Sequence, residues 1–250
     1  MKTIVLKHTI AYILPYRLTE RLKHGGIMTP FEKYQAVKKV YAAAANKENA
    51  QAMGKYMRNL FPFYGLKTPT RRELSRPFLK GVTKEEIAWD LVDLCFEDDY
   101  REMQYFALDY LKKVQKQLTF KDLPKIKQLA ETKSWWDSVD SLVKLAGQIF
   151  IRDEENKEKT AALMLAWAQD PDFWVRRTAI EFQLGLKEAT DPDLLGKIID
   201  GNLGSQEFFI NKAIGWALRD YSKTNPAWVR DYMASRQLSA LSRREGSKYI

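Results

Sequence analysis

The sequence predicts an all-α protein, an α-solenoid built from paired helices with a basic concave face. No segment shows the sustained alternation of apolar and polar residues that is typical of a β-strand. Several apolar-striped segments begin with Thr-Pro, Asp-Pro or Asn-Pro, which favours a helix start with a capping residue before proline. Helix pairs follow one another roughly every 35 to 45 residues, the spacing of HEAT-like repeats, although an irregular helical bundle remains an alternative.

The apolar residues place the helices as follows, in chain order. They are expected over 31–46, 47–60, 68–79, 87–96, 100–116, 123–130, 136–150, 155–168, 173–184, a short segment from 192, 206–223, 227–237 and 241–250. Thr29 before Pro30 is the expected cap of the first helix, and Ser205 that of the helix over 206–223. Thr83 and Glu86 have the spacing of a capping box before the helix over 87–96.

The sequence pattern of the first 27 residues differs from that of the rest of the chain. They end at a Gly-Gly pair, and Met28 could itself start a protein chain. We therefore expect residues 1–27 to be an extension of unknown role and 28–250 to be one domain that carries the function.

Composition excludes several classes of chemistry. The formal charge of +9 suggests a polyanionic partner. The single cysteine, Cys95, lies in an apolar segment and is expected to be a buried structural thiol. The only histidines, His8 and His24, precede the predicted domain, and no glycine-rich phosphate loop or paired-cysteine motif occurs. No apolar run reaches the roughly 20 residues that span a bilayer. We expect a cytoplasmic monomer without cofactor, metal or membrane association.

The segment TKSWWDSVDS carries the most distinctive pattern. If it is helical, Trp136 and Asp140 lie one turn apart on one face, whereas Asp137 points elsewhere. An indole beside a carboxylate suits a site that meets a flat cationic group. The alternative is that Trp136 is a core residue and that Asp140 pairs locally.

Two later predicted helices each combine a tryptophan with cationic residues on one face. Trp174 and Arg177 share one face, and Lys212, Trp216 and Arg219 follow one another at helical spacing. An indole flanked by cations fits a surface that holds phosphates and presents a ring to a base. The alternative is that long cationic side chains cover a core tryptophan.

The last helix adds Arg243, Arg244 and Lys248. We interpret these as cations at a helix start, a position that disfavours positive charge unless an anion is near. We expect Arg243 and Arg244 to contact DNA.

The motifs TKSWWDSVDS, WVRR with AIEFQ, and EFFINKAIGWALRDYSKTNP closely resemble the AlkD family of HEAT-like-repeat alkylpurine DNA glycosylases. KYMRNLFPFYGLKTPTRREL resembles the N-terminal helices of that family, and the resemblance extends from about Met28 to the C-terminus. It implies a site composed of Trp136, Asp140, Trp216, Arg177 and Tyr56.

The resemblance implies hydrolysis of the N-glycosidic bond of N3- or N7-alkylated purines in double-stranded DNA. Such a base is cationic and leaves as a neutral molecule, while positive charge develops on the sugar. We expect Asp140 to stabilise that charge, Trp136 and Trp216 to contact the lesion, and Arg177 to hold a phosphate.

Lys212, Arg219, Trp174, Arg243 and Arg244 are expected to bind DNA with Tyr56. Bound protein would be associated with the nucleoid. Two alternatives remain: a catalytically silent DNA-binding module of the same fold, and a protein–protein scaffold. An acidic residue beside a DNA-facing tryptophan argues against the first, because a carboxylate near phosphates lowers affinity. The second does not explain the faces that combine cations with an indole.

Overall fold

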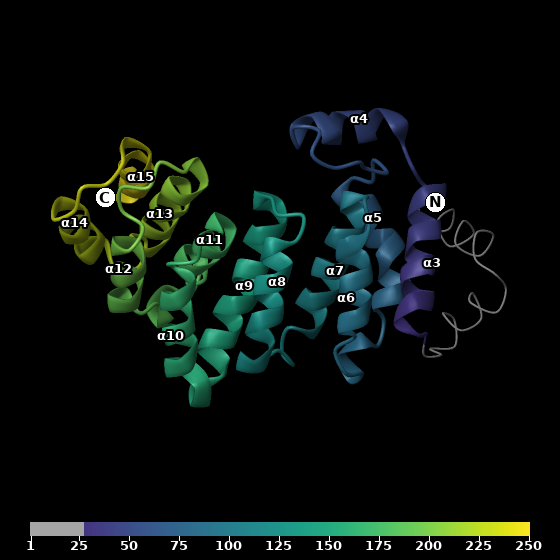
Figure 1. Ribbon diagram of the computed structural model, residues 1–250, viewed down its shortest axis with the longest axis horizontal. Helices are drawn as coiled ribbons and strands as arrows, with labels where there is room; N and C mark the ends of the chain where they lie inside the picture. The colour runs from purple at the N-terminus through teal and green to yellow at the C-terminus, as the bar shows by residue number, and fades with distance from the viewer. Residues whose placement is uncertain (1–27) are drawn as a thin grey trace. The chain divides into compact units, whose positions relative to one another are not determined.

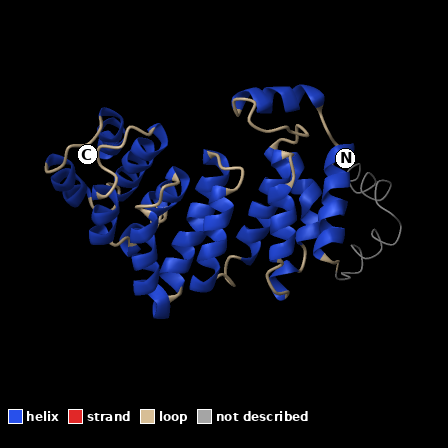
Figure 2. Cartoon of the chain, viewed as in Figure 1, coloured by secondary structure: helices blue, strands red, loops and turns tan. Residues whose placement is uncertain are grey.

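A computed structural model of the chain describes residues 28–250, and every regular element in that range is helical (Figures 1 and 2). The prediction of an all-α fold of helical-repeat type is therefore confirmed. The predicted extension, residues 1–27, lies outside the described residues. None of the helices between Met28 and Ile250 is long and apolar enough to cross a membrane.

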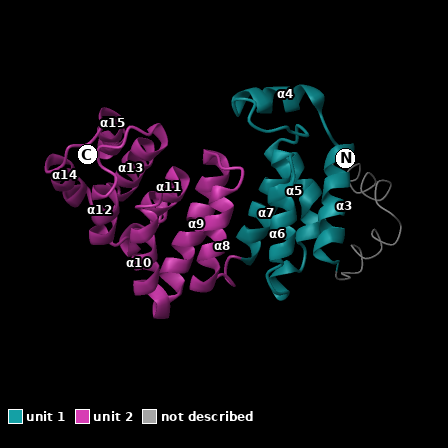
Figure 3. Cartoon of the chain, viewed as in Figure 1, with its two compact units in different colours: residues 1–114 teal, residues 115–250 magenta. Residues whose placement is uncertain are grey.

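The chain divides into two compact units, Met1–Val114 and Gln115–Ile250 (Figure 3). Each has its own core of packed helices. A single functional domain over 28–250 and a basic concave face along it stay predictions.

The first unit contains five α-helices in its described part. They are α3 (Pro30–Ala43), α4 (Lys47–Tyr56), α5 (Thr68–Ser75), α6 (Trp89–Glu97) and α7 (Arg101–Val114). Helix α6 packs on α3 and α7, while α4 crosses the ends of the bundle (Figure 1). The buried carboxylate of Glu102 holds the loop after α4, because it accepts hydrogen bonds from the amides of Tyr64, Gly65 and Leu66 at 2.8–3.0 Å.

Predicted helix starts and faces in this unit are mostly confirmed. Thr29 forms a capping box with Glu32 before Pro30. Cys95 is completely buried. The apolar stripe that is predicted for α7 is also buried. The capping box from Thr83 is wrong: α6 begins at Trp89 after Ala88, which supplies no side-chain cap.

The second unit contains the predicted catalytic residues. Its helices are α8 (Leu123–Glu131), α9 (Trp136–Arg152), α10 (Lys157–Trp167), α11 (Phe173–Glu181), α12 (Pro192–Asp200), α13 (Phe208–Tyr221), α14 (Pro226–Ala234) and α15 (Ala240–Gly246). Helix α11 contacts α8, α9, α10, α12 and α13 and is therefore the central element of the unit. Polar side chains on its buried faces must find partners on these neighbours.

Helices α13 and α15 pack most closely, and a glycine allows it. A Cβ atom on Gly215 would lie 2.5 Å from Cβ of Glu245, so only glycine fits at this crossing.

Two predictions for α13 and α15 are wrong. Ser205 does not cap α13, whose N-cap is Glu207. Arg243 and Arg244 lie in the last turn of the short α15 rather than at a helix start, and there they favour the helix dipole.

Candidate active site

The first turn of α9 places Trp136 and Asp140 on one side of the second unit. Trp136 is the first residue of the helix and packs, half-buried, against Val139, Val143 and Trp174. Asp140 follows one turn later, and about a quarter of its side chain is exposed (26%). The predicted helix and its pairing of indole and carboxylate are present.

Arg177 on α11 is buried against this carboxylate. Its side chain is 1% exposed, and its Nε and Nη2 donate to Oδ1 of Asp140 at 3.0 and 2.8 Å. Nη1 donates to the carbonyl oxygen of Phe209 on α13 at 2.8 Å. Both bonds from Arg177 end on Oδ1 of Asp140, so Oδ2 of Asp140 is not hydrogen-bonded to Arg177.

Glu181, one turn after Arg177, adds a second acidic group. Nη2 of Arg177 lies 2.9 Å from Oε1 of Glu181, but the angle makes this a charge contact without a hydrogen bond. Burial raises the pKa of Glu181 to about 8, against the opposing charge of Arg177. Burial also raises the pKa of Asp140, and Arg177 counteracts it. Asp140 keeps two strong hydrogen bonds and some solvent, so the shared proton resides on Glu181.

Trp216 on α13 is surrounded by cations. Arg177, Lys212 and Arg219 lie 5.4–5.6 Å from its ring centre, within the range of cation–π attraction. Its buried Nε1 finds no acceptor within residues 28–250.

Glu245 on α15 anchors these cations. It accepts from Arg219 at 3.0 Å and from Lys248 at 2.8 Å, and it pairs with Lys212 at 2.9 Å. Its hydrogen bonds to Lys248 and Lys212 lower its pKa to about 2. The predicted row of Lys212, Trp216 and Arg219 is therefore present on α13. The Glu245 carboxylate binds both cations of this row.

The remaining predicted DNA contacts differ in exposure. Arg243 and Arg244 are exposed on α15. Tyr56 ends α4 in the first unit and is 73% exposed. Trp174 is 6% exposed and packs against Trp135 and Phe209, so its packing argues against a direct contact with DNA.

Asp137 influences Asp140, although helical spacing predicts that it points elsewhere. Its negative charge is one of the influences that raise the pKa of Asp140, so the two carboxylates interact. It is therefore unsuitable as a control for Asp140.

Sequence reasoning missed Glu181, Glu245 and the carbonyl of Phe209. Glu181 could have been found from its spacing, because residues at i and i+4, such as Arg177 and Glu181, are neighbours on a helix. Nothing in the sequence pairs Glu245 with α13, because their contact depends on the α13–α15 crossing.

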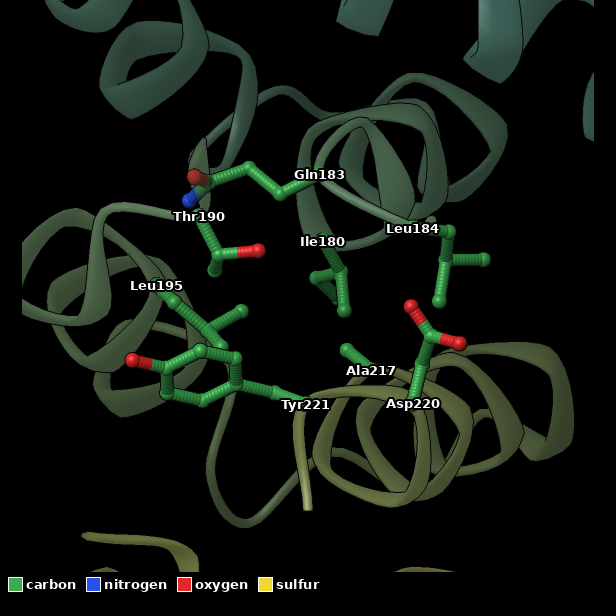
Figure 4. Close-up of a pocket in the computed structure, with 8 residues that line it drawn as sticks. All are labelled: Ile180, Gln183, Leu184, Thr190, Leu195, Ala217, Asp220 and Tyr221. Carbon is green, nitrogen blue, oxygen red and sulfur yellow. The ribbon is translucent and has the colours of Figure 1, made fainter. Parts of the chain in front are cut away.

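A small pocket lies in the same unit, between α11, α12 and α13 (Figure 4). Ile180, Leu195 and Ala217 line its apolar part, and Asp220 borders it. The Asp220 carboxylate accepts from the amide of Gly185 at 2.6 Å, so it serves the loop after α11. None of the predicted catalytic residues lines this pocket.

Comparison with known proteins identifies the family. Residues 37–250 match the family model described as DNA alkylation repair enzyme. A solved structure of a predicted DNA alkylation repair enzyme from Enterococcus faecalis is 37% identical, with a TM-score of 0.76 over 82% of this chain and 96% of that one. A search of curated proteins gives no match. The chain belongs to the AlkD-like family of DNA alkylation repair enzymes.

Proposed function

We propose that the protein is a monofunctional DNA glycosylase that releases cationic N3- or N7-alkylated purines from duplex DNA. The observation that carries the proposal is the partly exposed carboxylate of Asp140, held by a buried arginine beside two tryptophans. A fixed negative charge of this kind stabilises the positive charge that develops on deoxyribose as the neutral base leaves.

Asp140 acts electrostatically in this mechanism, and its Oδ2 is the oxygen that can face the sugar or orient the attacking water. Arg177 binds Oδ1 and therefore fixes the direction in which Oδ2 points. Trp136 and Trp216 contact the lesion or its sugar through their faces, because a cationic purine is attracted to an electron-rich ring. No metal or cofactor enters this reaction scheme.

Arg177 serves in our proposal to hold Asp140. A phosphate contact by Arg177, as the sequence suggests, would require the guanidinium to leave both Asp140 and the carbonyl of Phe209. Exposed Arg243 and Arg244 are better placed for phosphate contacts, and Tyr56 is a proposed contact on the other unit. Lys212 and Arg219 would approach DNA with part of their charge offset by Glu245, with which both are paired.

The test is release of 7-methylguanine from methylated duplex DNA by the purified protein, measured by chromatography of the free base. Asp140→Asn keeps the shape of the side chain and removes its charge. Excision should fall about 10²- to 10³-fold, the effect of losing one preorganised electrostatic group. Binding to damaged DNA should persist or tighten, because a negative charge near phosphates is lost.

Asp231→Asn on α14 is the matched control, since this aspartate is exposed and remote in sequence from the site. It should excise at the wild-type rate. A folded Asp140→Asn variant that also excises at that rate would remove Asp140 from the mechanism. Absence of base release by the wild-type protein would favour a catalytically silent DNA-binding module.

A further inference from the structure

Glu181 is a buried acidic residue beside Arg177 that has no role in the proposed mechanism. Its side chain is completely buried, and neither carboxyl oxygen accepts a hydrogen bond from a donor in the described part of the chain. The Asp140 carboxyl group lies within hydrogen-bonding range of Glu181. Among residues 28–250 its only cation is Arg177, whose Nη2 lies 2.9 Å from Glu181 and 2.8 Å from Asp140. Two carboxyl groups therefore share one guanidinium nitrogen.

We propose that Glu181 is a positioning residue which, as a neutral carboxylic acid, keeps Arg177 bonded to Asp140. In this form it donates its proton toward the Asp140 carboxylate and leaves that carboxylate as the only negative charge of the three groups. The proposal rests on the proposed glycosylase function, because it concerns how Asp140 is held for catalysis.

Burial decides which carboxyl group carries the proton. Two ionised carboxylates beside one arginine would leave a net negative charge in the core, and an unpaired buried charge is costly. Asp140 accepts two hydrogen bonds from Arg177 and is partly exposed, and both features stabilise its ionised form. Glu181 accepts no such bond and is completely buried. Burial, the largest influence on Glu181, accordingly raises its pKa to about 8.

The surrounding helices offer Glu181 no other charge partner. Asp140 faces it from α9 and Arg177 from its own helix, while Asp137 acts on it through Asp140. The two cations of α13, Lys212 and Arg219, are bonded to Glu245. Helices α8, α10 and α12, as the structure describes them, bury only apolar residues, glycine and one threonine.

Ionisation of Glu181 would change this arrangement. As the pH rises through about 8, a second carboxylate competes for Arg177 at equal distance. The guanidinium then divides between two carboxylates, and Asp140 loses the bonds that fix its orientation. Base excision should therefore decline above this pH, even though Asp140 is fully ionised there.

The first experiment titrates Glu181 directly, without reference to activity. Protein labelled with ¹³C at the glutamate carboxyl is titrated by NMR, and the Glu181 signal is assigned by its loss in Glu181→Gln. We expect a midpoint near 8 in the wild-type protein and a lower one in Asp140→Asn, where Arg177 is left to Glu181 alone. A midpoint near the ordinary value of about 4.3 would overturn the proposal.

The second experiment compares excision rates of wild type, Glu181→Gln and Glu181→Leu from pH 6 to 9 on the same methylated duplex. Glutamine stays neutral and can donate to Asp140, so its rate at pH 7 should be within about threefold of wild type, without the alkaline decline. Leucine fills the space but cannot donate, and its kcat should fall at least about tenfold with KM little changed.

Equal rates for the glutamine and leucine variants, or an alkaline decline that persists in Glu181→Gln, would overturn the positioning role. Melting temperatures of all three proteins separate these results from unfolding. If no protein releases base at any pH, the proposed glycosylase function fails, while the NMR titration still decides the protonation state of Glu181.

Discussion

Replacing Arg177 by methionine provides the sharpest test of the charge arrangement on α11. The substitution keeps an unbranched side chain in the core but removes the only cation between Asp140 and Glu181. It also deletes the bond to the carbonyl of Phe209. Breaking a buried ion pair from one side destabilises a protein by about 3–5 kcal/mol.

Protonation limits this loss. Asp140 can avoid being a buried ion by taking up a proton, which costs about 4 kcal/mol at pH 7 for a group with an ordinary pKa near 4. We therefore expect a loss of about 3–4 kcal/mol in the free energy of unfolding. For a chain of this size that is roughly a 10 °C fall in melting temperature. Thermal and urea denaturation measure both quantities.

The activity of Arg177→Met should depend on pH in a characteristic way. Without Arg177 the pKa of Asp140 rises further, because its main opposing influence is gone. Excision at pH 7 should fall toward that of Asp140→Asn. It should recover only in part as the pH rises and Asp140 ionises, because the bonds that orient Asp140 are gone. Asp140→Asn should keep its reduced rate at every pH, and the double variant should be no worse than Asp140→Asn alone.

Arg176→Met is the matched control on the same helix. Arg176 is half-buried and donates to the backbone carbonyls of Asp170 and Pro171, away from the site. It should lose less than about 1 kcal/mol and keep the wild-type excision rate. If Arg177→Met keeps its stability and loses only affinity for DNA, Arg177 binds a phosphate and the positioning role is refuted.

Three further predictions concern the surroundings of the site. The log affinity for undamaged duplex DNA should fall with log salt at about −0.9 per phosphate contacted, and salt-independent binding would contradict a basic DNA surface. Glu245→Gln should lower stability at pH 7. The deficit should shrink between about pH 4.5 and 2, because the lowered pKa of Glu245 stabilises the fold only while the carboxylate is ionised; a constant deficit would refute this. A chain that starts at Met28 should keep its melting temperature and activity, since Thr29 and Glu32 cap α3 locally; aggregation would show that residues 1–27 are needed.

The local part of the site could be predicted from the sequence. Helical spacing alone places Trp136 beside Asp140 and aligns Lys212 with Trp216, because neighbours on one helix do not depend on the rest of the fold. The same spacing connects Arg177 with Glu181.

The depth of each residue could not be predicted from the sequence. Arg177 and Trp174 have the spacing of a basic, aromatic surface, yet both are buried because α11 contacts five other helices. Burial of an arginine is decided by acceptors on other helices, here Asp140 on α9 and Phe209 on α13. The false capping box at Thr83 fails for a similar reason, since a local motif competes with the packing of α6.

The proposed function requires a basic protein to accept a cationic lesion, and the charges around Trp216 bear on that requirement. Arg177, Lys212 and Arg219 approach the same ring, and three uncompensated cations would repel an alkylated purine. Asp140 binds Arg177, Glu245 binds Lys212 and Arg219, and the two carboxylates offset two of the three charges. Ionisation of Glu181 would cancel the one remaining positive charge and draw Arg177 away from Asp140. The neutral state of Glu181 is therefore consistent with both demands on the site: one fixed carboxylate for the sugar, and a remaining positive charge for the phosphates.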